Sequence, residues 1–221
     1  MYIYAFSNHY EVVKEQLSNK KALLKKRINR SDNFVNLALL GVEKCLKEHQ
    51  LKEETHLYIS SQTGNINTTM KVFEAIFQKQ QLPMPFNFLN SVNASILFFV
   101  AKNFGIKGKA IFTDSFESAL TQALVDIQNN KTVLVGVVDE AISDLEKHKE
   151  KFQTNREEEH SSWVLLSPNI ESLEPLAKIE AIKLEVNDTR NFNKQFFQAL
   201  ENLQEEKKIE GEFLSLVVKK C

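Results

Sequence analysis

Two patterns of apolar residues alternate along the chain. Short continuous or alternating apolar runs predict strands at Tyr2–Phe6, His56–Ser60, Lys109–Phe112, Thr132–Val138, Ser162–Ser167, Leu176–Val186 and Glu212–Val218. Runs with an apolar residue every three or four positions predict helices at Asp32–His49, Asn67–Gln78, Ser91–Phe104, Ser115–Asn129 and Asn191–Gln204. Strands such as Val133–Val138 are apolar throughout, which is typical of a sheet covered on both faces. The pattern therefore predicts an α/β fold with helices on both faces of a layered sheet.

Polar and helix-breaking segments separate these elements. Pro83 and Pro85 predict a loop, and Gly105 is placed to end the helix before it. The segment Ser143–His160 is heavily charged, and we interpret it as a solvated loop with a helical turn. Another loop is expected at Pro168–Pro175.

The composition limits the classes of protein to which the chain can belong. A chain of 221 residues with 43% hydrophobic residues can bury a full core, which suits a single domain. Its formal net charge of −1 gives no electrostatic reason to expect binding to nucleic acid or to a membrane surface. No apolar run approaches the roughly 20 residues that span a bilayer, and the N-terminus has no basic leader. Cys45 and Cys221 form neither a disulfide framework nor a metal motif, so we expect a cytoplasmic protein without metal ion or cofactor.

Phenylalanine is unusually frequent. The chain has 16 Phe but one Trp and four Tyr, and nine of the Phe residues fall between Phe73 and Phe116. An aromatic-rich core is the simpler interpretation. The alternative is that some of these rings line an apolar tunnel or a large dimer interface.

The segment Lys109–Glu140 carries the clearest candidate chemistry. An apolar strand meets a tight polar elbow at Thr113–Asp114, a helix follows, and a second strand ends at Asp139-Glu140. Such an elbow can point a side chain into a pocket from a helix N-terminus, where the backbone dipole favours an anionic nucleophile.

Ser115 is the hydroxyl that this elbow offers as a nucleophile. It would need a general base within hydrogen-bond reach. The histidines fall in no recognisable site motif; they are His9, His49, His56, His148 and His160. A structural N-cap for the following helix is therefore the favoured interpretation of Ser115.

The same segment resembles the nucleophile elbow of the β-ketoacyl synthases, in the thiolase-like family. That family has Thr/Ser-Ala-Cys-Ser/Ala-Ser-Gly between strand and helix, and Ser118-Ala119 stands where it has Ser-Gly. Phe116 then occupies the place of the catalytic Cys, or Ser115 does if the elbow is shifted by one residue. The second strand ends Gly136–Glu140, close to the family's Gly-Gly-Val-Asp/Glu but with Val137 for the second Gly.

Other pieces resemble the family in the same order along the chain. They are Arg30–Leu46, His56–Asn65, Phe86–Ile106 and Ser161–Ser167. The resemblance implies a thiolase-like half with a mixed sheet. Residues 1–221 would be a single ketosynthase N-terminal-like domain, with a core half at 1–168 and a strand–helix–strand extension at 169–221.

The resemblance also implies a function. The family enzyme, 3-oxoacyl-[acyl carrier protein] synthase, is roughly twice this length, and its second half supplies two catalytic His and a Lys. A homologue without the Cys and that half is similar to a chain length factor, which is inactive by itself and pairs with an active ketosynthase. We therefore expect a cytoplasmic subunit of type II fatty-acid or polyketide synthesis, of the kind that makes polyene pigments. Its partner would be a full-length ketosynthase or a second copy, with an acyl carrier protein docking to the pair.

Two alternatives stay open at this point. One is a free-standing acyltransferase that uses Ser115. The other is a non-catalytic homodimeric scaffold.

The resemblance nominates particular residues. Helix Ser91–Phe104 and strand Lys109–Phe112 are expected at the dimer interface. The candidates for the acyl pocket or interface are Asn65, Asn93, Phe98, Phe99, Phe112 and Phe116. A basic cluster contains Lys25, Lys26, Arg27 and Arg30, which either form a solvated helix face or dock an acidic acyl carrier protein or another acidic partner surface.

Overall fold

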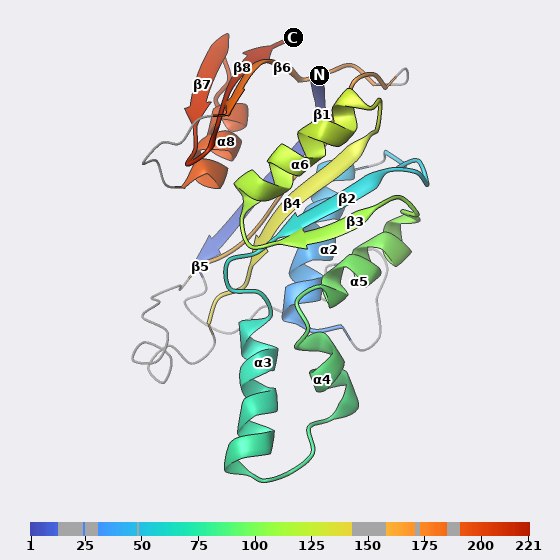
Figure 1. Ribbon diagram of the computed structural model, residues 1–221, viewed down its shortest axis with the longest axis vertical. Coiled ribbons are helices and arrows are strands. Elements are labelled where there is room, and N and C mark those ends of the chain that lie inside the picture. The colour runs from blue at the N-terminus through green and yellow to red at the C-terminus, as the bar shows by residue number, and fades with distance from the viewer. Residues whose placement is uncertain (13–23, 25–30, 48, 143–157, 171–172, 185–190) are drawn as a thin grey trace.

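The computed structural model contains one mixed sheet of eight strands (Figure 1). It describes residues 1–12, 24, 31–47, 49–142, 158–170, 173–184 and 191–221. The strand order is β3-β2-β4-β5-β1-β6-β8-β7. β2 pairs in parallel with β3 and β4, and every other neighbouring pair is antiparallel. The strands are β1 (Tyr2–Val12), β2 (His56–Ser60), β3 (Ala110–Thr113), β4 (Val133–Asp139), β5 (Glu158–Ser167), β6 (Ala177–Leu184), β7 (Glu206–Glu210) and β8 (Leu214–Lys220).

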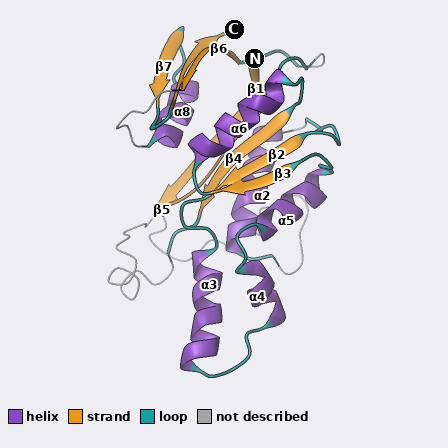
Figure 2. Cartoon of the chain, viewed as in Figure 1, coloured by secondary structure: helices purple, strands orange, loops and turns teal. Residues whose placement is uncertain are grey.

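Helices cover both faces of this sheet, as predicted (Figure 2). They are α2 (Asn33–Leu46), α3 (Ile66–Phe73) with the π-helical turn η1 (Glu74–Gln78), α4 (Pro85–Asn90), α5 (Ser95–Phe104), α6 (Phe116–Gln128) and α8 (Phe192–Glu201). α2 and α5 pack on one face, and α6 and α8 pack on the other. The mixed sheet and its two helical layers confirm the predicted fold class.

The two-residue alternation of the strands explains why both faces carry a core. In β2, Leu57 and Ile59 point toward α2 while Tyr58 points toward α6, and all three side chains are buried. The strand β4 is buried along its whole length. Such a strand can lie only in the middle of a layered structure, because each face must be covered by helices.

The bounds of several elements differ from the predicted ones. β1 runs on to Val12 and β5 begins at Glu158, because the two strands pair over this length and draw the end of the charged segment into the sheet. Residues 143–157 of that segment lie outside the described part of the chain. Pro85 begins α4 instead of lying in a loop, since a proline fits the first turn of a helix. α5 begins at Ser95, four residues later than the predicted Ser91.

The two edges of the sheet differ in character. β3, at one edge, is a short strand of Ala110, Ile111, Phe112 and Thr113 that pairs only with β2 in the described chain. β7, at the other edge, is the strand that the sequence pattern missed, because Ile209 is its single buried residue. Its exposed residues are Glu206, Lys207, Lys208 and Glu210.

Candidate functional site

The elbow between β3 and α6 is formed as the sequence predicts. Ser115 is the N-cap of α6: its hydroxyl accepts a hydrogen bond from the Ser118 N–H at 3.1 Å and donates one to Ser118 Oγ at 2.9 Å. The Thr113 hydroxyl donates to the Ser115 carbonyl at 2.9 Å. The Ser115 hydroxyl therefore already has a structural role at the start of the helix.

Phe116 is buried beneath this elbow in a cluster of aromatic rings. Its ring centroid lies 5.2 Å from that of Phe197, 5.5 Å from that of Phe196 and 6.3 Å from that of Phe192, all three on α8. Phe196 and Phe197 are fully buried. The C-terminal helix α8 thus closes the position that resembles the nucleophile site.

Glu117 ties the same elbow to the last two strands. Its buried carboxylate accepts backbone hydrogen bonds from Glu212 at 3.0 Å, Phe213 at 2.7 Å and Leu214 at 2.5 Å. A carboxylate that accepts several backbone N–H groups replaces the water those donors would otherwise need. The turn between β7 and β8 is therefore fixed against the N-terminus of α6.

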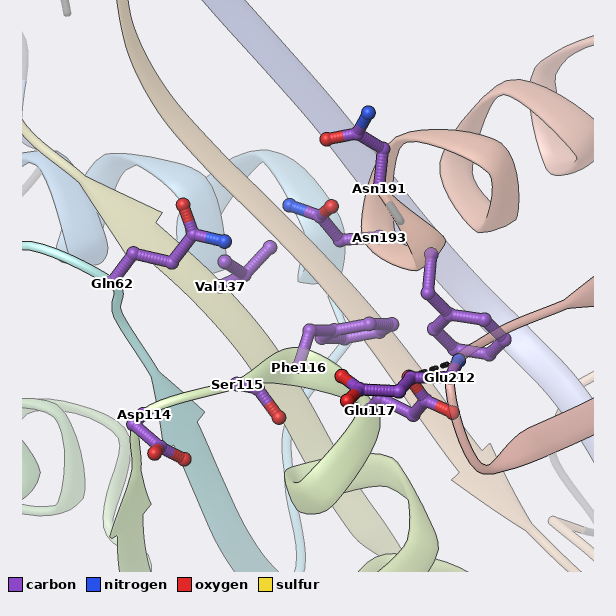
Figure 3. A pocket seen from close by; sticks show the side chains of 10 residues that line it. Gln62, Asp114, Ser115, Phe116, Glu117, Val137, Asn191, Asn193 and Glu212 are labelled. Carbon is purple, nitrogen blue, oxygen red and sulfur yellow. Dashed lines mark hydrogen bonds between the residues drawn. The ribbon is translucent and has the colours of Figure 1, made fainter. Parts of the chain in front are cut away.

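A small cavity of about 300 Å³ remains above the Phe116 ring. Its walls come from five segments of the chain: the turn after β2, residues Asp114–Glu117 of the elbow, β4 at Val137, the start of α8 and the β7–β8 turn (Figure 3). Gln62, Asn191 and Asn193 rim it with amide groups. No His, Cys or Lys stands among the described residues that line it, and its acidic side chains are Asp114, Glu117 and Glu212. The Ser115 hydroxyl donates its proton to Ser118 Oγ and not to one of these carboxylates.

The described histidines lie elsewhere. His56, at the opposite end of β2, places Nδ1 2.7 Å from Asp126 Oδ2. Although burial raises the pKa of the Asp126 carboxyl, hydrogen bonds from Lys109, Tyr58 and His56 outweigh it and lower that pKa to about 2. His160 Nε2 lies 3.6 Å from Asp139 Oδ2, and His9 Nδ1 lies 3.0 Å from Lys44 Nζ.

Asn65 and Asn93, two of the nominated residues, are brought together at the base of α3. The Asn65 N–H donates to Asn93 Oδ1 at 3.0 Å, and the Asn65 amide donates to the Asn90 carbonyl at 2.7 Å and to the Asp32 carboxylate. Gly64 precedes them with φ of +58°, and any Cβ there would overlap the Asn93 side chain. The fold thus uses these residues to join α3 to the segment between α4 and α5; a role in an acyl pocket stays a prediction.

A group of buried carboxylates next to them was not found from the sequence. Glu140 Oε1 accepts the Asn67 N–H at 3.0 Å, and the Asn33 amide lies 3.5 Å from both Glu140 Oε2 and Glu159 Oε2. Burial raises the pKa of Glu140 to about 7, and burial also raises the pKa of Asp32. The only sequence signal was a strand that ends in two acidic residues, which is usually read as a solvated end.

The nominated phenylalanines of α5 and β3 lie near the open sheet edge. Phe98 is 61% exposed, and its ring centroid lies 5.7 Å from that of Phe99 in an edge-to-face arrangement. Phe99 and Phe112 are partly buried against the α2 side of the core. These residues are placed where a partner could cover them, and this role also stays a prediction.

The remaining nominated residues are Lys25, Lys26, Arg27 and Arg30, and they lie outside the described residues. Within the described chain, no group of three or more metal-ligating side chains is found. No helix there is both long enough and apolar enough to cross a bilayer.

Comparison with known proteins gives matches of structure only. No family model and no curated protein sequence matches this chain. A ketosynthase (ApeO) in complex with its chain length factor (ApeC) from Xenorhabdus doucetiae is similar with a TM-score of 0.65 and 14% identity, over 100% of this chain and 100% of the matched chain. The ishigamide ketosynthase/chain length factor has a TM-score of 0.59 and 14% identity, over 78% of this chain and 55% of that one.

A third similar structure is the AntDE:AntF complex, a type II polyketide synthase acyl-carrier protein with its ketosynthase bound to the hexaketide. Its TM-score is 0.56 at 11% identity, over 70% of this chain and 49% of that one. This chain therefore spans about half the length of the second and third structures. At these identities the comparisons establish the thiolase-like fold that the sequence resemblance implied.

Proposed function

We propose that this chain is a chain-length-factor type of subunit, without catalytic activity of its own, that pairs with an active ketosynthase in type II fatty-acid or polyketide synthesis. The observation that carries the proposal is the burial of Phe116, at the position that resembles the family's nucleophile site, under three phenylalanines of α8. A benzyl side chain cannot attack a thioester, so the chemistry must reside in the partner.

The surroundings of Ser115 support the same conclusion. Its hydroxyl caps α6, and the cavity beside it contains amides and carboxylates but no described histidine. Acyl transfer through a serine needs a base to remove the hydroxyl proton. The acyltransferase alternative therefore has little support in the geometry.

The edge of the sheet at β3 and the exposed face of α5 support a partner there. β3 has no second neighbouring strand in the described chain, and Phe98 beside it is largely exposed. A strand edge with free backbone groups and an apolar flank is suited to protein association. A ketosynthase is the proposed partner because the similar structures include ketosynthases in complex with chain length factors.

Co-expression with a full-length ketosynthase from the same genome tests this function. We expect a 1:1 complex by mass measurement, and elongation of acyl chains by the ketosynthase only when this subunit is present. Phe98→Ser should weaken the complex, while Val125→Ser, an exposed apolar residue on α6, should leave it intact.

Two results would contradict the proposal. One is full activity of the ketosynthase alone with no complex formed, which leaves a homodimeric scaffold as the better account. The other is covalent acylation of the purified subunit by acyl carrier protein thioesters that is lost in Ser115→Ala, which would make it an acyltransferase.

A further inference from the structure

The segment α3–η1–α4 forms a helical hairpin that extends away from the body of the molecule (Figure 1). Its buried residues are few: Asn67, Thr68 and Val72 in α3, and Asn90 in α4. η1 has none. Helices this short are not stable in water on their own propensity, so the hairpin depends on what it packs against.

The hairpin instead exposes an unusual number of large apolar side chains. They are Phe73, Ile76, Phe77, Leu82, Met84, Phe86, Phe88 and Leu89. Leu82 at the tip is 96% exposed and Phe77 is 71% exposed. Between η1 and α4, Ile76, Leu82, Pro83, Pro85 and Phe88 line an apolar groove of about 680 Å³. Apolar surface of this extent on a soluble chain marks an interaction site.

The base of the hairpin is held firmly. Asn65 caps α3 through Thr68, while its amide bonds the Asn90 carbonyl at the end of α4. The Glu140 carboxylate accepts the Asn67 N–H at 3.0 Å in the first turn of α3. The apolar groove is therefore presented by a fixed arm, which reduces the entropy lost when a partner covers it.

The distribution of the exposed apolar residues favours the ketosynthase over a membrane surface as the partner that covers the hairpin. They continue from the tip through Phe88 and Val92 to Phe98 of α5, and α4 packs against α5. The hairpin therefore extends the same α5–β3 surface that the proposed function assigns to the ketosynthase. The helical arms carry only Lys71, Glu74 and Lys79 as charged residues, which gives little attraction to an anionic membrane surface.

We propose that the hairpin is a second arm of the interface that clasps the same ketosynthase, with an apolar side chain of that enzyme in the groove between η1 and α4. This inference rests on the proposed function and adds to it. The edge of β3 sets the register of the pair, and the hairpin supplies a separate apolar contact.

Substitutions at the tip test this arm. Leu82→Ser and Phe77→Ser alter side chains that make few contacts within the chain, so both variants should fold normally. We expect each to raise the Kd for the full-length ketosynthase at least tenfold, and Val125→Ser on α6 to change it less than twofold. Hydrogen exchange should slow at residues 66–92 when the ketosynthase is added.

The other outcomes separate the hairpin from the proposed function. If the wild-type chain binds the ketosynthase and both tip variants bind within twofold of it, the clasp is wrong while the proposed function stands. If the wild-type chain binds no ketosynthase, both are wrong. Self-association of the chain that Leu82→Ser abolishes, or binding to phosphatidylglycerol vesicles, would assign the hairpin to another occupant and overturn the clasp.

Discussion

At the scale of the residue, Glu140 shows how burial changes a side chain that looks ordinary in the sequence. It is 1% exposed, and its carboxylate shares the Asn33 amide with Glu159. Burial disfavours its charged form, and nearby Asp32 adds to this effect. The pKa of the Glu140 carboxyl consequently rises from 4.5 to about 7.

This pKa predicts a pH dependence of folding. Between about pH 4.5 and 7 the folded chain keeps the Glu140 proton while the unfolded chain has lost it. The free energy of unfolding should therefore fall as pH rises through that window, by on the order of 3 kcal/mol from this group. Glu140→Gln keeps an acceptor for the Asn67 N–H and cannot titrate, so its stability should change less across the window.

Urea unfolding of both proteins at pH 5, 6 and 7.5 measures this difference. Glu54→Gln, at an exposed position before β2, serves as the control and should follow the wild type. Equal pH slopes for the wild type and Glu140→Gln would contradict the prediction.

At the scale of the element, the hairpin depends on one asparagine. Asn65 is buried and bonds Asp32, Asn90 and Thr68 with its side chain. It therefore acts as the N-cap of α3 and as the connection between the two arms. The sequence pattern at Asn65 indicated a polar turn after a strand and not this connection, because Asp32 and Asn90 lie 33 and 25 residues away along the chain.

Asn65→Ala should loosen this element. The change removes the cap and leaves the Asn90 carbonyl and the Asp32 carboxylate without that donor, at a cost of roughly 2 kcal/mol in the free energy of unfolding. Amide exchange at residues 66–90 should accelerate more than that of α6, as measured by mass spectrometry. Gln78→Ala, on the exposed surface of η1, should leave the free energy of unfolding and the exchange rates unchanged. An equal acceleration of exchange in residues 66–90 and in α6 of the Asn65→Ala variant would contradict a local role.

At the scale of the whole molecule, local patterns predicted the layers well and the long-range contacts poorly. Continuous apolar strands and helices with one apolar face are local properties, so the buried strand β4 and the two helical layers were predicted. β7 was missed because four of its five residues are charged. The packing of α8 on Phe116 was not predictable, since hydrophobic periodicity gives the buried face of a helix and not the helix that it meets.

The join between the elbow and the C-terminal strands gives a prediction at this scale. Glu117→Ala should leave the N–H groups of Glu212, Phe213 and Leu214 without their acceptor. We expect the free energy of unfolding to fall by about 3 kcal/mol. Glu117→Gln keeps one acceptor oxygen, so its free energy of unfolding should lie between those of the wild type and Glu117→Ala.

Urea unfolding measures both Glu117 variants. The matched control is Gln128→Ala, an exposed position on the same helix, which should stay within about 0.5 kcal/mol of the wild type. A Glu117→Ala protein as stable as this control would show that the contact does not join the two parts.

The difference between the two edges of the sheet limits how many copies of the chain can associate through strand pairing. Charged side chains line β7, and charges on an edge strand discourage a further strand from pairing there. Of the two edges of the described sheet, only β3 is suited to pairing with a further strand, so a chain that has gained a neighbour there has no second edge of this kind. Raising the protein concentration would then increase the number of dimers and would not produce longer oligomers.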